Sequence, residues 1–141
     1  GAVVDAARVT RERSEFWGAL AQDEGRPWHC DAPDEALLVP LDEERLAVVL
    51  DALLGNVLTH TAPPAGCHIS VARDGGEVHI RIDDDGPGFD AAATTRGRSG
   101  GGSTGLGLDI ARRTAEAAGG SLRIGGRRHG GRVDLRLPSA G

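Results

Sequence analysis

Three segments of the sequence carry residue types that could bind a ligand as well as support a fold. The first contains Asn56, which falls at the border of an apolar stripe in residues 42–62, with Ala52 and His60 along the same edge. A side-chain amide oxygen there could coordinate Mg²⁺, which takes oxygen ligands and shares them with substrate phosphates. Taken alone, such an asparagine is more often a half-buried structural amide.

The second segment places three acidic residues directly before Gly86, Pro87 and Gly88. This composition ends a strand, and its simplest reading is a tight turn. Beside an apolar pocket, however, the carboxylate of Asp85 could accept a hydrogen bond from an exocyclic amine such as that of adenine. A ligand without that amine would leave the charge unpaired, so Asp85 would select the base.

The third segment is the glycine-rich start of a predicted helix, Gly105-Leu106-Gly107-Leu108, which follows Ser103 and Thr104. The free backbone N–H groups and partial positive charge of a helix N-terminus bind phosphate, and the two hydroxyl groups could add donors. The same glycines could instead allow close helix packing. Arg96 and Arg98 are the nearest basic residues by sequence, although a solvated loop arginine explains each of them equally well.

The helices that would position these segments follow from the spacing of apolar residues. We expect one helix over residues 6–24, with three large apolar side chains on one side: Phe16, Trp17 and Leu20. A second helix begins after the N-cap residue Asp42, buries the stripe that Asn56 borders, and ends before Pro63. A third opens at Gly105 and closes at Gly119.

Short alternating runs predict the strands. Residues 28–30 and 36–41 are β-compatible, residues 69–71 and 78–82 form a hairpin, and two more strands lie at 122–124 and 133–137. Residues 90–104 hold too few apolar groups to fix a conformation, so we expect a mobile lid there. The predicted fold class is α+β, with helices packed on one face of a largely antiparallel sheet.

The length, composition and charge of the chain exclude several classes of protein. A chain of 141 residues, 39% hydrophobic and 26% charged, makes one domain of ordinary size. All 16 basic residues are arginine, which excludes a phosphate loop with its lysine, a Schiff-base lysine and the protein-kinase lysine. The formal charge of -5 argues against a nucleic-acid-binding domain.

Two further expectations concern the state of the chain. No apolar run is long enough to span a membrane, and Cys30 and Cys67 are expected to be plain thiols. The initial glycine and the absence of methionine indicate that residues 1–141 are one domain excised from a longer protein.

In combination, the three segments resemble the ATP-binding domain of sensor histidine kinases, whose superfamily includes gyrase, the large heat-shock chaperone and the mismatch-repair ATPases. LDALLGNVLTHT resembles the N box of that family, with Asn56 at the metal-binding asparagine. Asp85, Gly86 and Gly88 resemble the first glycine box, in which the aspartate recognises adenine. STGLGLDIARR, with Gly105 and Gly107, resembles the second.

The resemblance implies the two-layer α/β sandwich called the Bergerat fold, with a mixed, mostly antiparallel sheet and three helices on one face. It implies Mg²⁺-ATP as the ligand and transfer of the γ-phosphoryl group to a histidine on a separate dimerisation domain. It also implies a set of binding residues, with the metal on the asparagine and with no catalytic base in this chain: Asn56, His60, Asp85, Gly86, Gly88, Ser103, Thr104, Gly105, Leu106, Gly107 and Leu108.

The resemblance implies partners as well. None of the five histidines lies in the family's acceptor motif, so the domain would be inactive without the helical phosphoacceptor domain of the same protein. A cognate response regulator would act downstream. The parent protein would be a homodimer, and this domain would be cytoplasmic, with or without a membrane anchor elsewhere, and would contact neither nucleic acid nor membrane.

Three departures from the family pattern leave the activity open. Ala52 stands where many members have asparagine and where gyrase-like ATPases have the glutamate that activates water, which disfavours hydrolysis. Thr59 replaces a basic residue, and the lid lacks the phenylalanine-containing F box. The alternatives are a nucleotide-binding module with weak or no kinase activity, and a serine kinase of the anti-sigma-factor type.

Overall fold

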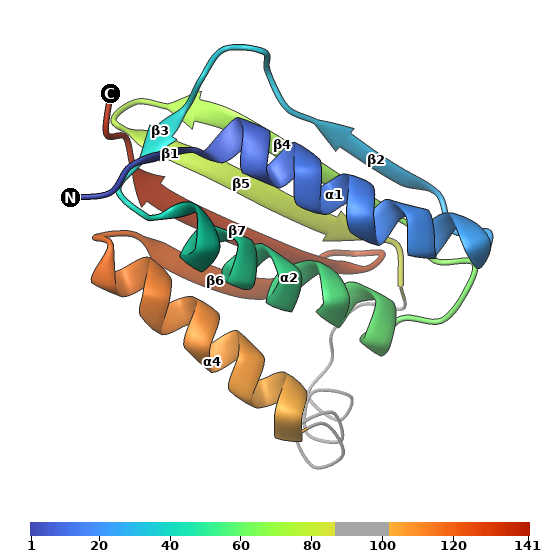
Figure 1. Ribbon diagram of the computed structural model, residues 1–141. Helices are drawn as coiled ribbons and strands as arrows, with labels where there is room; N and C mark the ends of the chain where they lie inside the picture. Colours follow the sequence, from blue (N-terminus) through green and yellow to red (C-terminus); the bar gives the residue numbers. More distant parts are fainter. Residues whose placement is uncertain (87–101) are drawn as a thin grey trace.

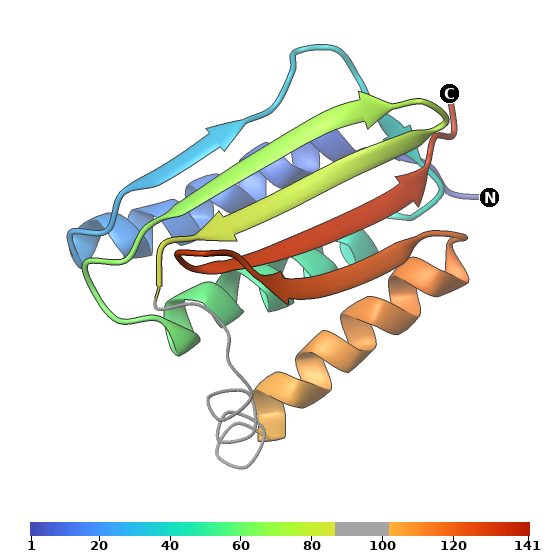
Figure 2. The same cartoon turned by 180° about the vertical axis from the view of Figure 1, so that it is seen from behind.

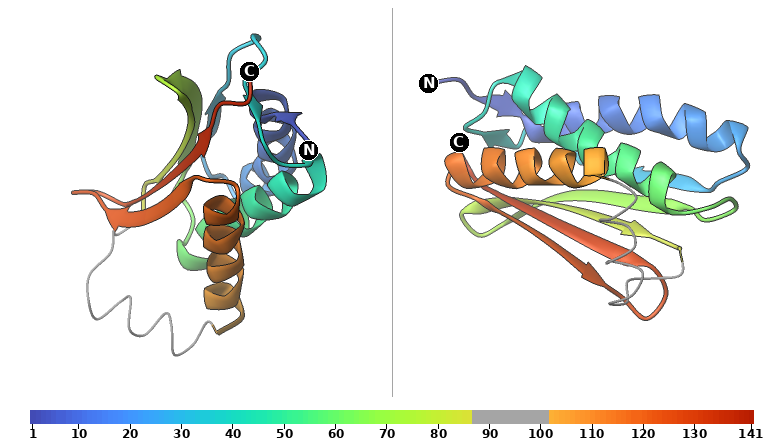
Figure 3. Two further views of the ribbon diagram at one scale, coloured as in Figure 1. Left: turned by 90° about the vertical axis from the view of Figure 1, so that its left-hand side faces the viewer. Right: turned by 90° about the horizontal axis from the view of Figure 1, so that it is seen from below.

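The computed structural model describes residues 1–86 and 102–141, and for residues 102–106 the backbone alone. Helices α1, α2 and α4 form one layer and a five-stranded sheet forms the other (Figure 1; Figure 3). The elements in chain order are β1 (Val4–Asp5), α1 (Ala6–Asp23), β2 (Trp28–Asp31), β3 (Leu38–Val39), α2 (Glu43–His60), β4 (Cys67–Asp74), β5 (Glu77–Asp84), α4 (Gly102–Ala117), β6 (Ser121–Gly126) and β7 (Gly131–Pro138).

The sheet has the strand order β2-β4-β5-β7-β6. Strands β2 and β4 run parallel, and the other three neighbouring pairs run antiparallel. A short antiparallel pair, β1 with β3, lies apart from it. The prediction of an α+β fold with a mixed, mostly antiparallel sheet and helices on one face is therefore confirmed.

The two faces of the sheet differ because side chains alternate along each strand. In β5, every second residue is apolar and buried beneath the helices: Val78, Ile80 and Ile82. The residues between them, such as Arg81, lie on the other face, which no described helix covers (Figure 2). The same alternation holds in β4 and β7. One face supplies the core, and the other is polar.

Helix α2 forms where its apolar period predicts it. The carboxylate of Asp42 accepts a hydrogen bond from the backbone N–H of Arg45 at 2.7 Å and so caps the first turn. The helix contributes one buried stripe, which consists of Leu46, Val49, Leu50, Leu53, Leu54 and Val57. The stripe packs toward the sheet, and the half-buried Asn56 is left at its edge.

Helix α1 has the predicted range, but of its three large apolar residues only Trp17 packs against the core. Phe16 is 51% exposed and Leu20 is 44% exposed. The buried residues are small or medium in size: Ala6, Ala7, Val9, Thr10, Ser14 and Ala21. Small side chains let a helix approach its neighbours closely, so α1 packs through them and through Trp17, and leaves Phe16 and Leu20 outside.

Helix α4 begins at Gly102, so the prediction that it opens at Gly105 is wrong by three residues. Ser103 and Thr104, which the sequence analysis placed in a lid, belong to the helix. Small polar residues suit a first turn because its N–H groups lack intrahelical acceptors. The rest of the predicted lid, including Arg96 and Arg98, lies outside the described residues.

Two expectations from composition hold for the described residues. None of their helices has the length and apolar character needed to cross a membrane. Cys67 is buried and Cys30 half-buried, and both are free thiols. Burial raises the pKa of the Cys67 thiol, and nearby acidic groups raise it further, so this sulfur stays protonated.

Candidate functional site

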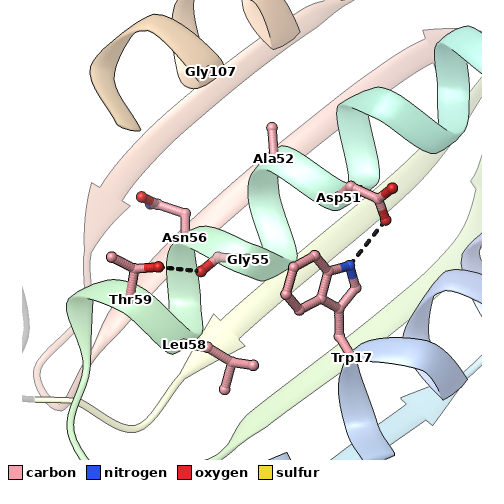
Figure 4. Close-up of a pocket in the computed structure, with 8 residues that line it drawn as sticks. All are labelled: Trp17, Asp51, Ala52, Gly55, Asn56, Leu58, Thr59 and Gly107. Carbon is pink, nitrogen blue, oxygen red and sulfur yellow. Dashed lines mark hydrogen bonds between the residues drawn. The ribbon is translucent and has the colours of Figure 1, made fainter. Parts of the chain in front are cut away.

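A pocket lies along α2, between Trp17 of α1 and Gly107 of α4. Figure 4 shows Ala52 and Asn56 on the side of α2 toward Gly107, and Trp17 on the opposite side of the helix. A Cβ atom added at Gly107 would lie 3.8 Å from the Cβ of Ala52, so the two helices come close here. The residues that line the pocket are Trp17, Asp51, Ala52, Gly55, Asn56, Leu58, Thr59 and Gly107. The fold thus brings the first and third predicted segments together.

The side chain of Asn56 carries an unsatisfied oxygen. Its Oδ1 atom is buried and accepts no hydrogen bond from the described part of the chain. A buried acceptor without a donor costs about 1–3 kcal/mol, and a bound cation would remove that cost. An amide oxygen is a ligand type that Mg²⁺ accepts, so the residue fits the predicted metal.

Contacts with α1 hold α2 in one orientation about its helix axis. Trp17 Nε1 donates to Asp51 Oδ1 at 2.9 Å, and Arg13 Nε donates to the same oxygen at 2.7 Å. A Cβ atom at Gly55 would lie 3.0 Å from the Trp17 ring, so the ring packs directly on the helix backbone. These contacts keep the opposite side of α2, with Asn56, turned toward α4.

Arg26 fixes the end of α2, a role that the sequence analysis did not identify. Its side chain is buried, and its Nη1 and Nη2 donate to Thr61 Oγ1 at 2.7 Å and to the Thr61 carbonyl at 2.8 Å. A cation at a helix C-terminus is favourable, and these donors satisfy acceptors near the helix end. Because Arg26 lies 35 positions from Thr61 in the chain, no local pattern marks it.

The carboxylates at the end of β5 have different surroundings. Asp84 continues the helix-facing alternation of the strand, and its Oδ1 accepts hydrogen bonds from Gly86 N at 2.9 Å and Gly131 N at 3.1 Å. The Asp85 side chain is 65% exposed and lies 3.6 Å from Arg127. Asp85 therefore lies in an exposed position next to Arg127, and its role in recognising adenine stays a prediction. The period of two in β5 places Asp84 on the helix-facing side of the sheet.

The turn after β5 packs tightly against its neighbours. A Cβ atom at Gly86 would lie 2.7 Å from Thr61 Cγ2, so this position has room only for glycine. Gly130 in the β6–β7 connection has a φ of +106°, and a Cβ there would overlap the Asp84 carbonyl. Arg127 Nη2 donates to the same carbonyl at 2.8 Å. The end of α2 and the β6–β7 connection together support the acid-glycine turn.

The remaining predicted residues are distributed around this pocket. Because α4 begins at Gly102, its free amides belong to residues 102–104, and Gly107 lies in the second turn. Leu108 is half-buried against the core. His60 is the exposed last residue of α2 and is outside the set that lines the pocket. Gly88 lies outside the described residues.

Solved structures define the class of fold to which this arrangement belongs. The catalytic domain of histidine kinase ThkA has a TM-score of 0.83 to this chain at 21% identity, covering 98% of this chain and 95% of its own. The mycobacterial sensor histidine kinase MprB has a TM-score of 0.74 at 21% identity, with 98% and 97% covered. The fold is that of histidine kinase catalytic domains, as the resemblance predicted.

Sequence similarity identifies the family. Residues 41–141 match the model of the histidine kinase-, DNA gyrase B-, and HSP90-like ATPase family, and the chain belongs to this family. The signal transduction histidine-protein kinase AfsQ2 of Streptomyces coelicolor is 40% identical over 111 residues, 70% of this chain and 20% of AfsQ2. The sensor histidine kinase TcrY of Mycobacterium tuberculosis is 32% identical over 126 residues, 81% of this chain and 26% of TcrY.

These matches confirm that the chain is an ATP-binding catalytic domain of the sensor histidine kinase type. The chain spans about a fifth to a quarter of the length of the curated relatives it matches.

Proposed function

We propose that this domain binds Mg²⁺-ATP in the pocket between α2 and α4 and donates the γ-phosphoryl group to a histidine of a helical dimerisation domain. The observation that carries this proposal is the buried Oδ1 of Asn56, which lacks a partner among the described residues. It lies in a domain of an ATPase family and opposite the start of a glycine-rich helix. Bound there, Mg²⁺ would supply positive charge against the phosphates.

Asp84 is our proposed recognition residue for the adenine amine, in place of Asp85. Its carboxylate faces the helix side of the sheet, where the pocket lies, and the two amides that bond to Oδ1 leave Oδ2 for a ligand. Asp85 is largely exposed, and a hydrogen bond in contact with water discriminates weakly between ligands. Gly86 and Gly88 would let the base approach the backbone.

The phosphates would lie at the N-terminal end of α4. The amides of Ser103 and Thr104 in the first turn have no intrahelical acceptor, Gly105 follows them directly, and a helix N-terminus attracts anions. We also expect Leu106, Gly107 and His60 to contact the bound nucleotide.

The chain contributes positioning and charge to the transfer. Phosphoryl transfer depends mainly on alignment and on stabilisation of phosphate charge. Ala52 presents a methyl group to the pocket beside Asn56, so no carboxylate activates water at that place. We therefore propose slow hydrolysis, with ATP retained for transfer to the acceptor histidine. The same proposal includes a homodimeric parent protein, a response regulator that accepts the phosphoryl group, and a cytoplasmic location.

Calorimetric titration with a non-hydrolysable ATP analogue, with and without Mg²⁺, tests the metal site. We expect Mg²⁺ to strengthen binding to the wild-type chain, and we expect Asn56→Ala to remove that dependence because the variant lacks the amide oxygen. Val48→Ala, which changes an exposed residue of the same helix, should keep the Mg²⁺ dependence of binding. A Mg²⁺ dependence that persists in Asn56→Ala would contradict the assignment.

Transfer is tested separately with radiolabelled ATP and the phosphoacceptor domain of the parent protein. Label on the acceptor histidine is expected when the two domains are mixed. If the analogue binds but no label is transferred, the domain is a nucleotide-binding module and the kinase proposal is wrong.

A further inference from the structure

A cluster of two histidines and one aspartate lies on the open face of the sheet, away from the helices. Strands β2 and β4 run parallel in a register that pairs His29 with His68. Their neighbours Cys30 and Ile69 point to the helix side, so both imidazoles point outward. Asp31 follows His29 by two residues and shares its face. Tertiary pairing thus brings together three ligand-type side chains from segments far apart in sequence.

The three side chains converge on a small volume. Asp31 Oδ1 lies 3.0 Å from His29 Nε2, and Asp31 Oδ2 lies 2.9 Å from His68 Nε2. The imidazole rings meet edge to face, with centroids 4.8 Å apart. The potential ligand atoms all lie within 4.8 Å of one another. Both Nε2 atoms are therefore directed at the same carboxylate.

This spacing suits a metal ion of the zinc class. With metal–ligand bonds of about 2.0–2.2 Å, neighbouring ligand atoms of a tetrahedral site lie roughly 3.3 Å apart. The two nitrogen–oxygen distances are already near that value, and the side chains are 53% to 64% exposed, so they can turn slightly at little cost. Exposure also leaves room for water as a further ligand.

The chemistry of the donors favours a transition metal over Mg²⁺. Imidazole nitrogen suits Zn²⁺, Cu²⁺ and Ni²⁺, whereas Mg²⁺ takes oxygen ligands. In the metal-free arrangement each Nε2–H donates to the carboxylate; a metal would bind both Nε2 lone pairs, and each neutral ring would then carry its proton on Nδ1. No arginine of the described residues pairs with Asp31, whose ionic partners there are the two histidines.

The carboxylate of Asp83, which lies next to this cluster, already has an ionic partner. Asp83 stands opposite His68 in the adjacent strand β5, and Arg132 binds it with contacts of 2.7 and 3.2 Å. Asp83 is therefore occupied and does not compete with Asp31 for the histidines.

We propose that His29, Asp31 and His68 form a binding site for one Zn²⁺ ion, which links edge strand β2 to β4 on the face of the sheet opposite the nucleotide pocket. The ion would tie the α1–β2 unit to the rest of the sheet. Because it would bind the folded arrangement and not the separated strands, it would also raise the stability of the domain.

The test uses the 141-residue chain without a polyhistidine tag, stripped with a chelator and titrated calorimetrically with ZnCl₂ in the absence of nucleotide. We expect saturation at one equivalent and a higher thermal midpoint with zinc. His29→Ala and His68→Ala should each weaken binding at least about tenfold, since even outer contacts of metal sites contribute 10–100-fold. MgCl₂ should produce neither effect.

A matched variant and an independent measurement complete the test. His129→Ala removes another exposed histidine, from the β6–β7 connection, and should leave zinc binding unchanged. Nitrogen NMR of the wild-type histidine rings needs no variant, and zinc should shift the Nε2 resonances of two rings, those of His29 and His68. Affinity that is unchanged in both alanine variants, or ring shifts confined to other histidines, would overturn the proposal.

Discussion

At the residue scale, the end of β5 illustrates how one position along a strand changes what a carboxylate can do. Asp84 and Asp85 are neighbours with the same side chain, but alternation turns the first toward the helices and the second toward solvent. The backbone amides of Gly86 and Gly131 then hold Asp84 in one orientation. Orientation and burial, more than residue type, separate our proposed recognition residue from a surface charge.

This difference predicts opposite outcomes for two matched substitutions. Asp84→Asn keeps an oxygen that can accept from Gly86 and Gly131 but presents an NH₂ group where the adenine amine would bind. It should weaken binding of the ATP analogue at least tenfold, about 1.4 kcal/mol. Asp85→Asn should change the affinity less than threefold.

Calorimetry on both variants, with thermal melts to confirm folding, provides the comparison. A large loss in Asp85→Asn together with normal binding by Asp84→Asn would restore the role to Asp85.

At the scale of elements, α2 carries the site and is held at two places. Trp17 and Arg13 contact Asp51 in the middle of the helix, and Arg26 binds the residue that ends it. Thr61 is also the residue against which Gly86 packs. Gly86 and the end of α2 therefore depend on the same buried arginine, which couples their positions.

Removal of this arginine should destabilise the domain. Arg26→Met keeps much of the apolar stem but leaves the Thr61 carbonyl without its donor, which should lower the free energy of unfolding by about 1–3 kcal/mol. Arg45→Met, at the exposed start of the same helix, should change it by less than about 0.5 kcal/mol. Denaturant titration measures the free energy of unfolding of both variants. Equal losses in Arg26→Met and Arg45→Met would show that Arg26 does not hold the helix end.

At the scale of the whole molecule, the sheet separates two environments. Its helix side is apolar, whereas its open side, which no described helix covers in Figure 2, carries charges that pair across strands. Asp134 in β7 shows the pattern, because His79 Nε2 lies 2.7 Å away and Arg81 Nε donates at 3.1 Å. Burial opposes ionisation of Asp134, but the hydrogen bonds of His79 and Arg81 outweigh it and lower the pKa of its carboxyl group.

A lowered carboxyl pKa predicts the pH dependence of stability. A carboxyl group whose pKa is lower in the folded state stabilises the fold at pH values above its pKa in the unfolded chain, which is about 3.9 for aspartate. This stabilisation disappears as the pH falls through the pKa of the group in the folded state. Asp134→Asn should therefore be less stable than wild type at neutral pH, and the difference should shrink below about pH 4. Chemical denaturation across this range measures it.

Asp34→Asn, an exposed change in the segment between β2 and β3, serves as the control and should show little difference at any pH. A difference between wild type and Asp134→Asn that grows in acid would contradict the argument.

The sequence by itself determined which elements form and which residue types could bind a nucleotide. The apolar period of α2, its cap at Asp42 and the alternation in the β4–β5 hairpin are local patterns, and each predicted element is present. Asn56 could be identified because the edge of a helix stripe follows from the same period. Local hydrogen bonding and side-chain geometry set these features, so a short stretch of sequence contains them.

Tertiary structure decided which residues meet. The buried side of α1, the contact of Arg26 with Thr61 and the pairing of His29 with His68 each join segments that no local pattern links. These depend on how helices pack and on the register between strands, because burial and hydrogen bonding are settled only when the whole core closes. Asp84 stands between the two cases: alternation along β5 predicts which face it lies on, but its hydrogen bond from the amide of Gly131 forms only in the folded domain.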